Sequence, residues 1–284
     1  MIKKYSTGIL LTLFITFFLF ACSGTGKDKT RYINLETSEG LIKLRLYNNT
    51  PLHRDNFINL VNEGYYDNIK FHRVIEDFMI QAGDYTTRPD LEADTSGRYD
   101  YTIPAEIIVT NFHKRGALAA ARTGDRFNPE RKSSGTQFYI VQGRKFDGQI
   151  TEEGDTINAE MMIEHVENRI NSSLKQNIFY MHLRNERQKS EDSGDGRSDA
   201  EIQEAATILT YTDLENYKPV EIPDEHVSVY RSEGGAPHLD MQYTVFGEVV
   251  EGMDVVDRIA GVETGAGDRP LKDVIITGAK VVRK

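Results

Sequence analysis

The sequence of 284 residues contains a single cysteine, Cys22, and fewer positive than negative charges. One cysteine excludes an intrachain disulfide, and the sequence has neither an HExxH pattern nor a Cys/His cluster, so we expect no metal site. Lysine and arginine number 34 against 44 aspartates and glutamates. Binding to nucleic acid depends mostly on a basic surface that releases counterions. The acidic balance therefore argues against a nucleic-acid partner.

Several other signatures are missing. No glycine-rich stretch follows the phosphate-loop pattern, and the serines at 133 and 134 lack a G-x-S-x-G setting. The sequence shows no period of 20 to 50 residues, which argues against repeat architectures. With 39% hydrophobic and 27% charged residues, the chain is typical of a globular protein with one large or two modest domains. We expect a monomer that needs no cofactor.

The N-terminus differs in character from the rest of the chain. Lys3 and Lys4 precede an apolar run, residues 9–20, that is too short to span a bilayer but typical of a signal-peptide core. Residues 1–21 are therefore predicted to be a signal peptide. Residues 22–30 are mostly small or polar and without periodicity, which predicts a tether.

The sequence Leu-Phe-Ala-Cys at residues 19–22 resembles the lipobox of bacterial lipoproteins. The resemblance implies that Cys22 becomes the lipidated first residue and anchors the protein in a membrane of the cell envelope. Acyl chains contribute about 0.8 kcal/mol per buried CH₂, so several chains would give a stable anchor. The alternative is an ordinary secretory peptide with an incidental cysteine.

From residue 31 the pattern predicts many short strands and few helices. Residues 32–46 alternate between apolar and polar around a turn at 38–40, which indicates a β-hairpin. Pro51 begins a helical stretch, Gly64 is placed to end it, and residues 253–259 form a second candidate helix. Further short apolar runs at residues 71–75, 78–81, 117–121, 137–141, 244–250 and 274–282 are typical of strands. This combination favours a closed antiparallel barrel.

Residues 143–237, which we call the insert, interrupt that pattern. Apolar residues recur every fourth position on an otherwise polar stretch, which predicts an amphipathic helix with Met162, Val166, Ile170 and Leu174 on one face. The acidic, glycine-containing residues 190–198 predict a loop. Ser198 and Glu201 have the spacing of a capping box for a second helix that buries Ile202, Ala206 and Leu209. The insert is predicted to be a helical hairpin packed on the barrel.

Five segments carry a resemblance to a known family. They are FHRVIEDFMIQAGD at 71–84, PAE at 104–106, GALAAAR at 116–122, TQFYIV at 136–141 and HLDMQYTVFGEV at 238–249. In this order they closely resemble the cyclophilins, over residues 31–142 and 238–284. The resemblance implies a mainly β fold, a closed antiparallel cyclophilin-like barrel capped by two helices, with the insert added. It also implies peptidyl-prolyl cis-trans isomerase activity.

The same resemblance assigns roles to individual residues. It places Arg73 and Gln81 as the catalytic residues that contact the substrate backbone. The proline ring of the substrate would lie in a pocket formed by Phe78, Met79, Tyr139 and Leu239, with Ala121, Arg122 and Tyr243 lining the groove beside it. Arg122 replaces the usual Asn, Tyr243 replaces a usual His, and His238 stands where several members have Trp. In the family the contact at the Arg122 position is largely through the main chain, so this substitution need not abolish binding. The departures at Tyr243 and His238 concern peptide preference and any binding of cyclosporin.

The expected substrates are proline-containing peptides and partly folded exported proteins, whose folding the isomerase would assist at the cell envelope. On a strand, residues two apart share a face, so Arg73 lies in one row with Phe71 and Ile75 beside an apolar pocket.

Two alternatives remain open at this stage. The protein could be a binding module that keeps the groove but has little catalysis, with the helical insert as its interaction surface, or the insert could fold over the groove and regulate it.

Overall fold

The computed structural model describes residues 30–92, 96–150 and 156–283. The predicted signal peptide, Cys22 and nearly all of the predicted tether lie outside these residues. Within the described ranges, no helix combines the length and the apolar character needed to cross a membrane.

The centre of the molecule is an eight-stranded antiparallel sheet with the strand order β12-β1-β2-β11-β6-β8-β4-β3. Its strands are β1 (Arg31–Thr37), β2 (Gly40–Leu46), β3 (Arg73–Ile75), β4 (Met79–Ala82), β6 (Ala117–Ala120), β8 (Phe138–Val141), β11 (Val245–Glu251) and β12 (Ile276–Val282). Each predicted run therefore contains a strand, within one or two residues at its ends. The hairpin of β1 and β2 turns between Thr37 and Gly40, as predicted.

The prediction of a closed barrel is wrong in one detail, because the sheet is open between its edge strands β3 and β12. Isolated backbone hydrogen bonds connect the segment before β3 to the start of β12 and the residues preceding it: Phe71 N donates to Val274 O at 2.9 Å, Ile276 N donates to Ile69 O at 2.9 Å and Asn68 N donates to Ile276 O at 2.7 Å. The segment before β3 is bent at Asn68, which has a φ of 67°. A left-handed residue interrupts extended backbone, so a continuous ladder does not form there.

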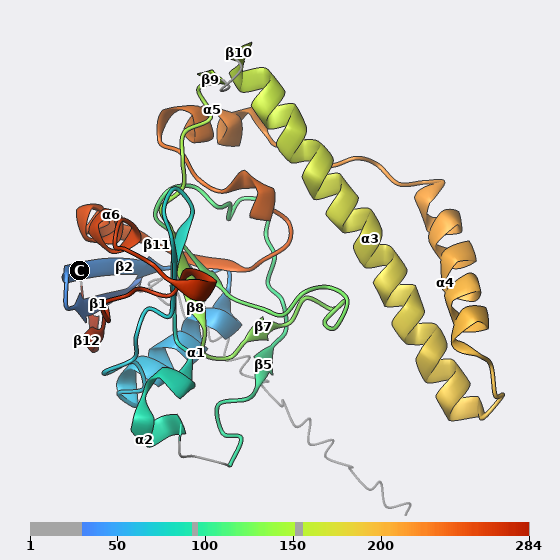
Figure 1. Cartoon of the computed structure of the whole chain (residues 1–284), viewed down its shortest axis with the longest axis horizontal. Coiled ribbons are helices and arrows are strands. Elements are labelled where there is room, and N and C mark those ends of the chain that lie inside the picture. The colour runs from blue at the N-terminus through green and yellow to red at the C-terminus, as the bar shows by residue number, and fades with distance from the viewer. Residues whose placement is uncertain (1–29, 93–95, 151–155, 284) are drawn as a thin grey trace, which may run out of the picture.

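Two helices, α1 (Pro51–Asn62) and α6 (Met253–Ala260), cover the barrel-like sheet on either side (Figure 1). In α1 the residues Phe57, Leu60 and Val61 are buried, and the helix is followed by Gly64 with a φ of 68°. The core they cover consists of inward-facing strand residues such as Ile33, Leu35, Ile42 and Leu44, all fully buried. Alternate residues of each strand point into this core, which leaves the others for the outer face.

The remaining elements are short or belong to the insert. They are η1 (Tyr85–Thr87), α2 (Pro89–Glu92), β5 (Thr102–Ile103), β7 (Ser133–Ser134), β9 (Gln149–Ile150), β10 (Thr156–Ile157), α3 (Ala159–Ser193), α4 (Asp199–Leu214), α5 (Asp224–Ser232), η2 (Pro237–Leu239) and η3 (Ala266–Asp268). Helices α3 and α4 form an antiparallel hairpin that extends away from the barrel (Figure 1).

The hairpin follows most of the predicted pattern. Met162, Val166 and Ile170 of α3 are buried and Leu174 is partly buried. In α4 the prediction for Leu209 is wrong, since it is 37% exposed and the neighbouring Thr210 faces α3 instead. The predicted loop is also shorter, because α3 continues to Ser193 and ends at the left-handed Gly194. The sequence of this 16-residue helix is compatible with two buried faces that differ by one residue, one containing Leu209 and the other containing Thr210.

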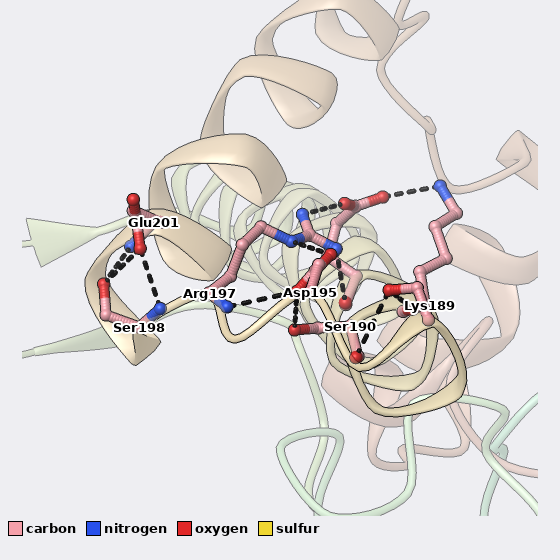
Figure 2. Close-up of polar contacts among 8 residues, drawn as sticks. Lys189, Ser190, Asp195, Arg197, Ser198 and Glu201 are labelled. Atoms are coloured by element: carbon pink, nitrogen blue, oxygen red, sulfur yellow. Dashed lines mark hydrogen bonds and ion pairs between the residues drawn. The ribbon is translucent and has the colours of Figure 1, made fainter.

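The turn between α3 and α4 is built from charged and hydroxyl side chains (Figure 2). Ser198 and Glu201 form the predicted capping box in both directions. The buried Glu186 carboxylate accepts from Arg197 Nη1 at 2.8 Å and from Lys189 Nζ at 2.6 Å. These contacts satisfy the helix ends and fix the two helices at their distal end.

The insert has its own small core. Its buried residues are Phe146, Met162, Ile163, Val166, Ile170, Ile222 and Tyr230. This cluster joins the first half of α3 to α5 and to the chain that leaves β8. The proximal end of the insert is therefore packed tightly, whereas the distal half of the hairpin contacts mainly itself.

Candidate active site

A cavity of about 250 Å³ opens on the outer face of the sheet; we call it the site cavity. It is lined by the nine residues that the family resemblance assigns to the site: Arg73, Phe78, Met79, Gln81, Ala121, Arg122, Tyr139, Leu239 and Tyr243. The strand register explains how they meet. Gln81 lies opposite Arg73 on β3 and opposite Tyr139 on β8, and directly opposed residues share a face of the sheet.

One side of the site cavity is apolar. Met79, Ala121 and Tyr139 are at most 8% exposed, while Phe78, Leu239 and Tyr243 are partly buried around them. The rings of Tyr139 and Tyr243 are 5.9 Å apart and nearly perpendicular. A pocket of this size with aromatic walls suits a small apolar ring such as that of proline.

Other residues that line the site cavity are polar. The Arg73 guanidinium is partly exposed, and its Nε donates to Asp268 Oδ2 at 3.1 Å. Among the described residues this is the one ion pair of Arg73, so both Nη groups remain available to a ligand. Gln81 Nε2 donates to Gln137 Oε1 at 3.1 Å. Asp268 and Gln137 thus orient the two predicted catalytic side chains.

The Arg122 side chain is anchored in the wall of the groove by three contacts. Its Nε donates to Gln242 O at 2.8 Å, and it pairs with Asp125 at 2.5 Å. Its guanidinium also lies 4.4 Å from the centroid of the Tyr243 ring, a cation–π distance. The Arg122 side chain therefore holds the groove wall together, which leaves its main chain for a peptide.

The site depends on residues that the sequence did not reveal. His113 is 1% exposed and lies behind Tyr139, with its Nε2 2.9 Å from the Tyr139 hydroxyl and its Nδ1 2.8 Å from Asp240 Oδ1. The Tyr230 hydroxyl donates to Asp240 Oδ2 at 2.6 Å. His113 and Asp240 are 127 positions apart, and no local spacing connects them.

The insert approaches the rim of the site cavity without lining it. Ser173 of α3 donates to Gln242 Oε1 at 2.5 Å, and Gln242 Nε2 donates to His238 O at 2.6 Å. Of the residues that line the site cavity, none belongs to residues 143–237. In this structure the insert supports the rim and does not cover the groove.

His238 packs against a residue of the site cavity, with its ring 5.2 Å from that of Phe78. Burial and, to a smaller extent, the nearby positive charge of Arg169 together lower its pKa to about 4. The unfolded chain, with an ordinary histidine pKa near 6.5, binds this proton more tightly than the folded chain does. Stability therefore decreases as the pH falls from about 6.5 toward 4.

We expect His238→Gln, which stays neutral at every pH, to flatten that decrease. The measurement is urea unfolding of parent and variant at several pH values between 4 and 8. His182, whose Nε2 lies 2.7 Å from Asp213 on the distal hairpin, provides the matched control, since His182→Gln leaves the Phe78 environment unchanged. An identical pH slope in the parent and in His238→Gln would contradict the assignment.

Among the described residues, no group of three or more His, Cys, Asp or Glu side chains could hold a metal ion. The residues that line the site cavity offer hydrogen-bond donors and an apolar pocket. A guanidinium beside a proline-sized pocket can donate to a peptide group held there, and this requires no nucleophile.

Comparison with known proteins agrees with the geometry. The family model of the cyclophilin-type peptidyl-prolyl cis-trans isomerases matches residues 32–190 and 221–281. A peptidyl-prolyl cis-trans isomerase of Staphylococcus aureus is 28% identical over 249 residues, which cover 87% of this chain and 89% of that protein. A bifunctional phosphatase/peptidyl-prolyl cis-trans isomerase of Streptococcus pyogenes is 29% identical over 252 residues, and the match spans 88% of this chain but only 38% of that longer protein.

A solved structure supports the fold. The cyclophilin-type peptidyl-prolyl cis-trans isomerase of Cryptosporidium parvum superposes with a TM-score of 0.50 at 17% identity, covering 90% of this chain and 99% of that one. The family match extends over most of the chain and includes all nine residues that line the site cavity. The chain belongs to the cyclophilin-type peptidyl-prolyl cis-trans isomerases.

Proposed function

We propose that this isomerase acts on the X-Pro bonds of exported, partly folded proteins at the cell envelope, where a lipid on Cys22 anchors it and where it works as a monomer. The observation that carries the proposal is the position of Arg73 beside a proline-sized apolar cavity, in a chain whose first 22 residues resemble a lipoprotein signal. The acidic balance of the chain is compatible with a polypeptide substrate.

The chemistry follows from the peptide bond itself. Amide resonance imposes a barrier of ~18–20 kcal/mol on rotation, and the resonance is lost when the bond twists. In the twisted form the prolyl nitrogen is pyramidal and its lone pair can accept a hydrogen bond. An Nη group of Arg73 is our candidate for the donor, because it stabilises the twisted state more than either planar state.

Magnitudes show that Arg73 cannot act alone. One hydrogen bond to a charged group contributes about 1.5–3 kcal/mol, whereas a rate gain on the order of 10⁵ requires about 7 kcal/mol. The remainder must come from the site cavity. Met79 and Tyr139 hold the proline ring while the preceding carbonyl rotates, and Gln81 binds the peptide backbone.

The proposed location is tested by Cys22→Ser, which removes the sulfur that would carry the lipid. We expect the variant to move from the membrane fraction to the soluble fraction, because the short apolar run alone does not span a bilayer. The measurement is fractionation of cells followed by mass determination of the mature protein. Ser23→Ala, one residue further on, is the control and should stay membrane-bound. A Cys22→Ser protein that remains in the membrane at normal mass would refute the lipid anchor.

A further inference from the structure

A row of buried polar side chains connects the wall of the site cavity to the insert; we call Tyr139, His113, Asp240 and Tyr230 the polar row. The Tyr139 hydroxyl is 2.9 Å from His113 Nε2, and His113 Nδ1 is 2.8 Å from Asp240 Oδ1. The other carboxylate oxygen, Oδ2, accepts from the Tyr230 hydroxyl at 2.6 Å. Tyr139 lines the cavity, whereas Tyr230 lies in α5 of the insert.

The polar row is shielded from water along its whole length. Its four members are between 0% and 8% exposed. In such surroundings each hydrogen bond is stronger than in water, and a member that loses its partner is left unsatisfied. The main chain reinforces the row, because His113 N also donates to Asp240 Oδ1 at 2.9 Å and Ala236 N donates to His113 O at 2.8 Å.

The contact between His113 and Tyr139 bears on the orientation of the Tyr139 ring. The His113 and Tyr139 rings are within 10° of parallel, with their centroids 6.1 Å apart, and His113 contacts Tyr139 through its hydroxyl. The last torsion of a tyrosine side chain has broad minima, so packing and the hydroxyl partner decide the ring plane. That plane forms the aromatic wall on which a proline ring would lie. Tyr243 packs edge-on against both rings.

The far end of the row is tightly packed. Tyr230 is fully buried, and its ring makes edge contacts with Phe112 at 5.5 Å and Phe146 at 6.1 Å between centroids. It belongs to the small core that also contains the first half of α3. The insert therefore holds the last hydroxyl of the row in a fixed position.

We propose that His113, Asp240 and Tyr230 are positioning residues for the isomerase reaction, and that through them the insert sets the orientation of the Tyr139 wall. The insert is then part of the support of the active site and not only an addition to the barrel. The proposal rests on the proposed role of the site cavity as the proline pocket.

A double-mutant cycle tests the proposal. Tyr230→Phe removes one hydroxyl and keeps the ring packing. We expect it to lower kcat/KM for an X-Pro peptide by about 3- to 10-fold, the size of a single hydrogen-bond effect. In a Tyr139→Phe background, where the hydroxyl that the row orients is absent, the same substitution should change kcat/KM by less than about 2-fold. Coupled residues show such non-additivity, whereas independent ones add.

Tyr217→Phe is the matched control, because the Tyr217 hydroxyl also lies in the insert and donates to Asn171 Oδ1 at 2.7 Å, away from the site cavity. It should leave kcat/KM within about 2-fold of the parent in both backgrounds. Asp240→Asn interrupts the row at a second point and should depend on the Tyr139 hydroxyl in the same way. It serves in place of Tyr230→Phe should that variant fold poorly.

Equal losses from Tyr230→Phe with and without the Tyr139 hydroxyl would overturn the proposal, as would a loss no larger than that of Tyr217→Phe. These results are distinct from failure of the proposed function itself. If the parent protein did not accelerate isomerisation, there would be no kcat/KM to compare, and the cavity would not be an isomerase site.

Discussion

Replacing Arg73 with alanine should lower kcat/KM for an X-Pro peptide by about 10- to 150-fold, the loss expected for one hydrogen bond to a charged donor. Most of the decrease should appear in kcat, because Arg73 in the proposed mechanism donates to the twisted state in preference to the planar ground states. Peptide affinity should weaken only modestly, since Phe78, Met79 and Tyr139 remain in place. The measurement is line-shape or exchange NMR on a proline-containing peptide.

Arg73→Lys separates the placement of the donor from its charge. Lysine keeps the positive charge but offers a flexible point charge in place of a planar fork that Asp268 holds at Nε. We expect a loss close to that of Arg73→Ala, with an unchanged unfolding midpoint. Full activity in the lysine variant would show that a nearby charge is sufficient.

Arg258→Ala provides the control for both substitutions. Arg258 is an exposed arginine of α6 that pairs with Asp254 at 2.8 Å, and it does not line the site cavity. Its replacement should leave kcat/KM unchanged, because an exposed i,i+4 pair contributes little. An Arg73→Ala protein that isomerises the peptide as fast as Arg258→Ala would mean that Arg73 is not the donor.

Replacing Gly235 with alanine should cost about 3 kcal/mol or more of unfolding free energy, because the backbone at this position leaves no room for a side chain. Gly235 has a φ of +157°, and an added Cβ would lie 2.4 Å from His113 O and 2.5 Å from Tyr230 Cε1. Gly235 also exchanges backbone hydrogen bonds with Arg144. The substitution must therefore separate the insert from the barrel or distort the polar row.

Gly196→Ala is the matched control at the distal turn of the hairpin. Gly196 has a φ of +70° but nothing lies within 4 Å of an added Cβ. The left-handed backbone alone should cost about 1–2 kcal/mol. Urea unfolding of both variants gives the comparison, and equal losses would contradict the tight contact of Gly235 with His113 and Tyr230.

Much of the fold could be predicted from local sequence patterns. The alternation of residues 32–46 predicted the β1–β2 hairpin, and Pro51 marked the start of α1, because strand and helix periods are properties of neighbouring residues. The open edge between β3 and β12 had no such signal. This opening depends on how the segment bent at Asn68 contacts β12, which lies about two hundred residues further along the chain.

The candidate site likewise contains residues that could be predicted from the sequence and residues that could not. The nine residues of the site cavity were predicted from a long, ordered family resemblance, and the structure brings all nine together. His113, Asp240 and Tyr230 were not predicted, because their contacts join positions up to 127 residues apart. Sequence spacing along one strand cannot show that a histidine behind Tyr139 shares a carboxylate with a tyrosine of the insert.

We propose that the site cavity catalyses rotation about X-Pro bonds. Exchange NMR of a short X-Pro peptide with the full chain in detergent tests it most directly, since one titration reports both affinity and interconversion rate. We expect exchange cross-peaks between cis and trans peptide that appear only with protein, are lost with excess competing X-Pro peptide and are strongly reduced in Arg73→Ala. Binding of the peptide without any acceleration of its interconversion would contradict it.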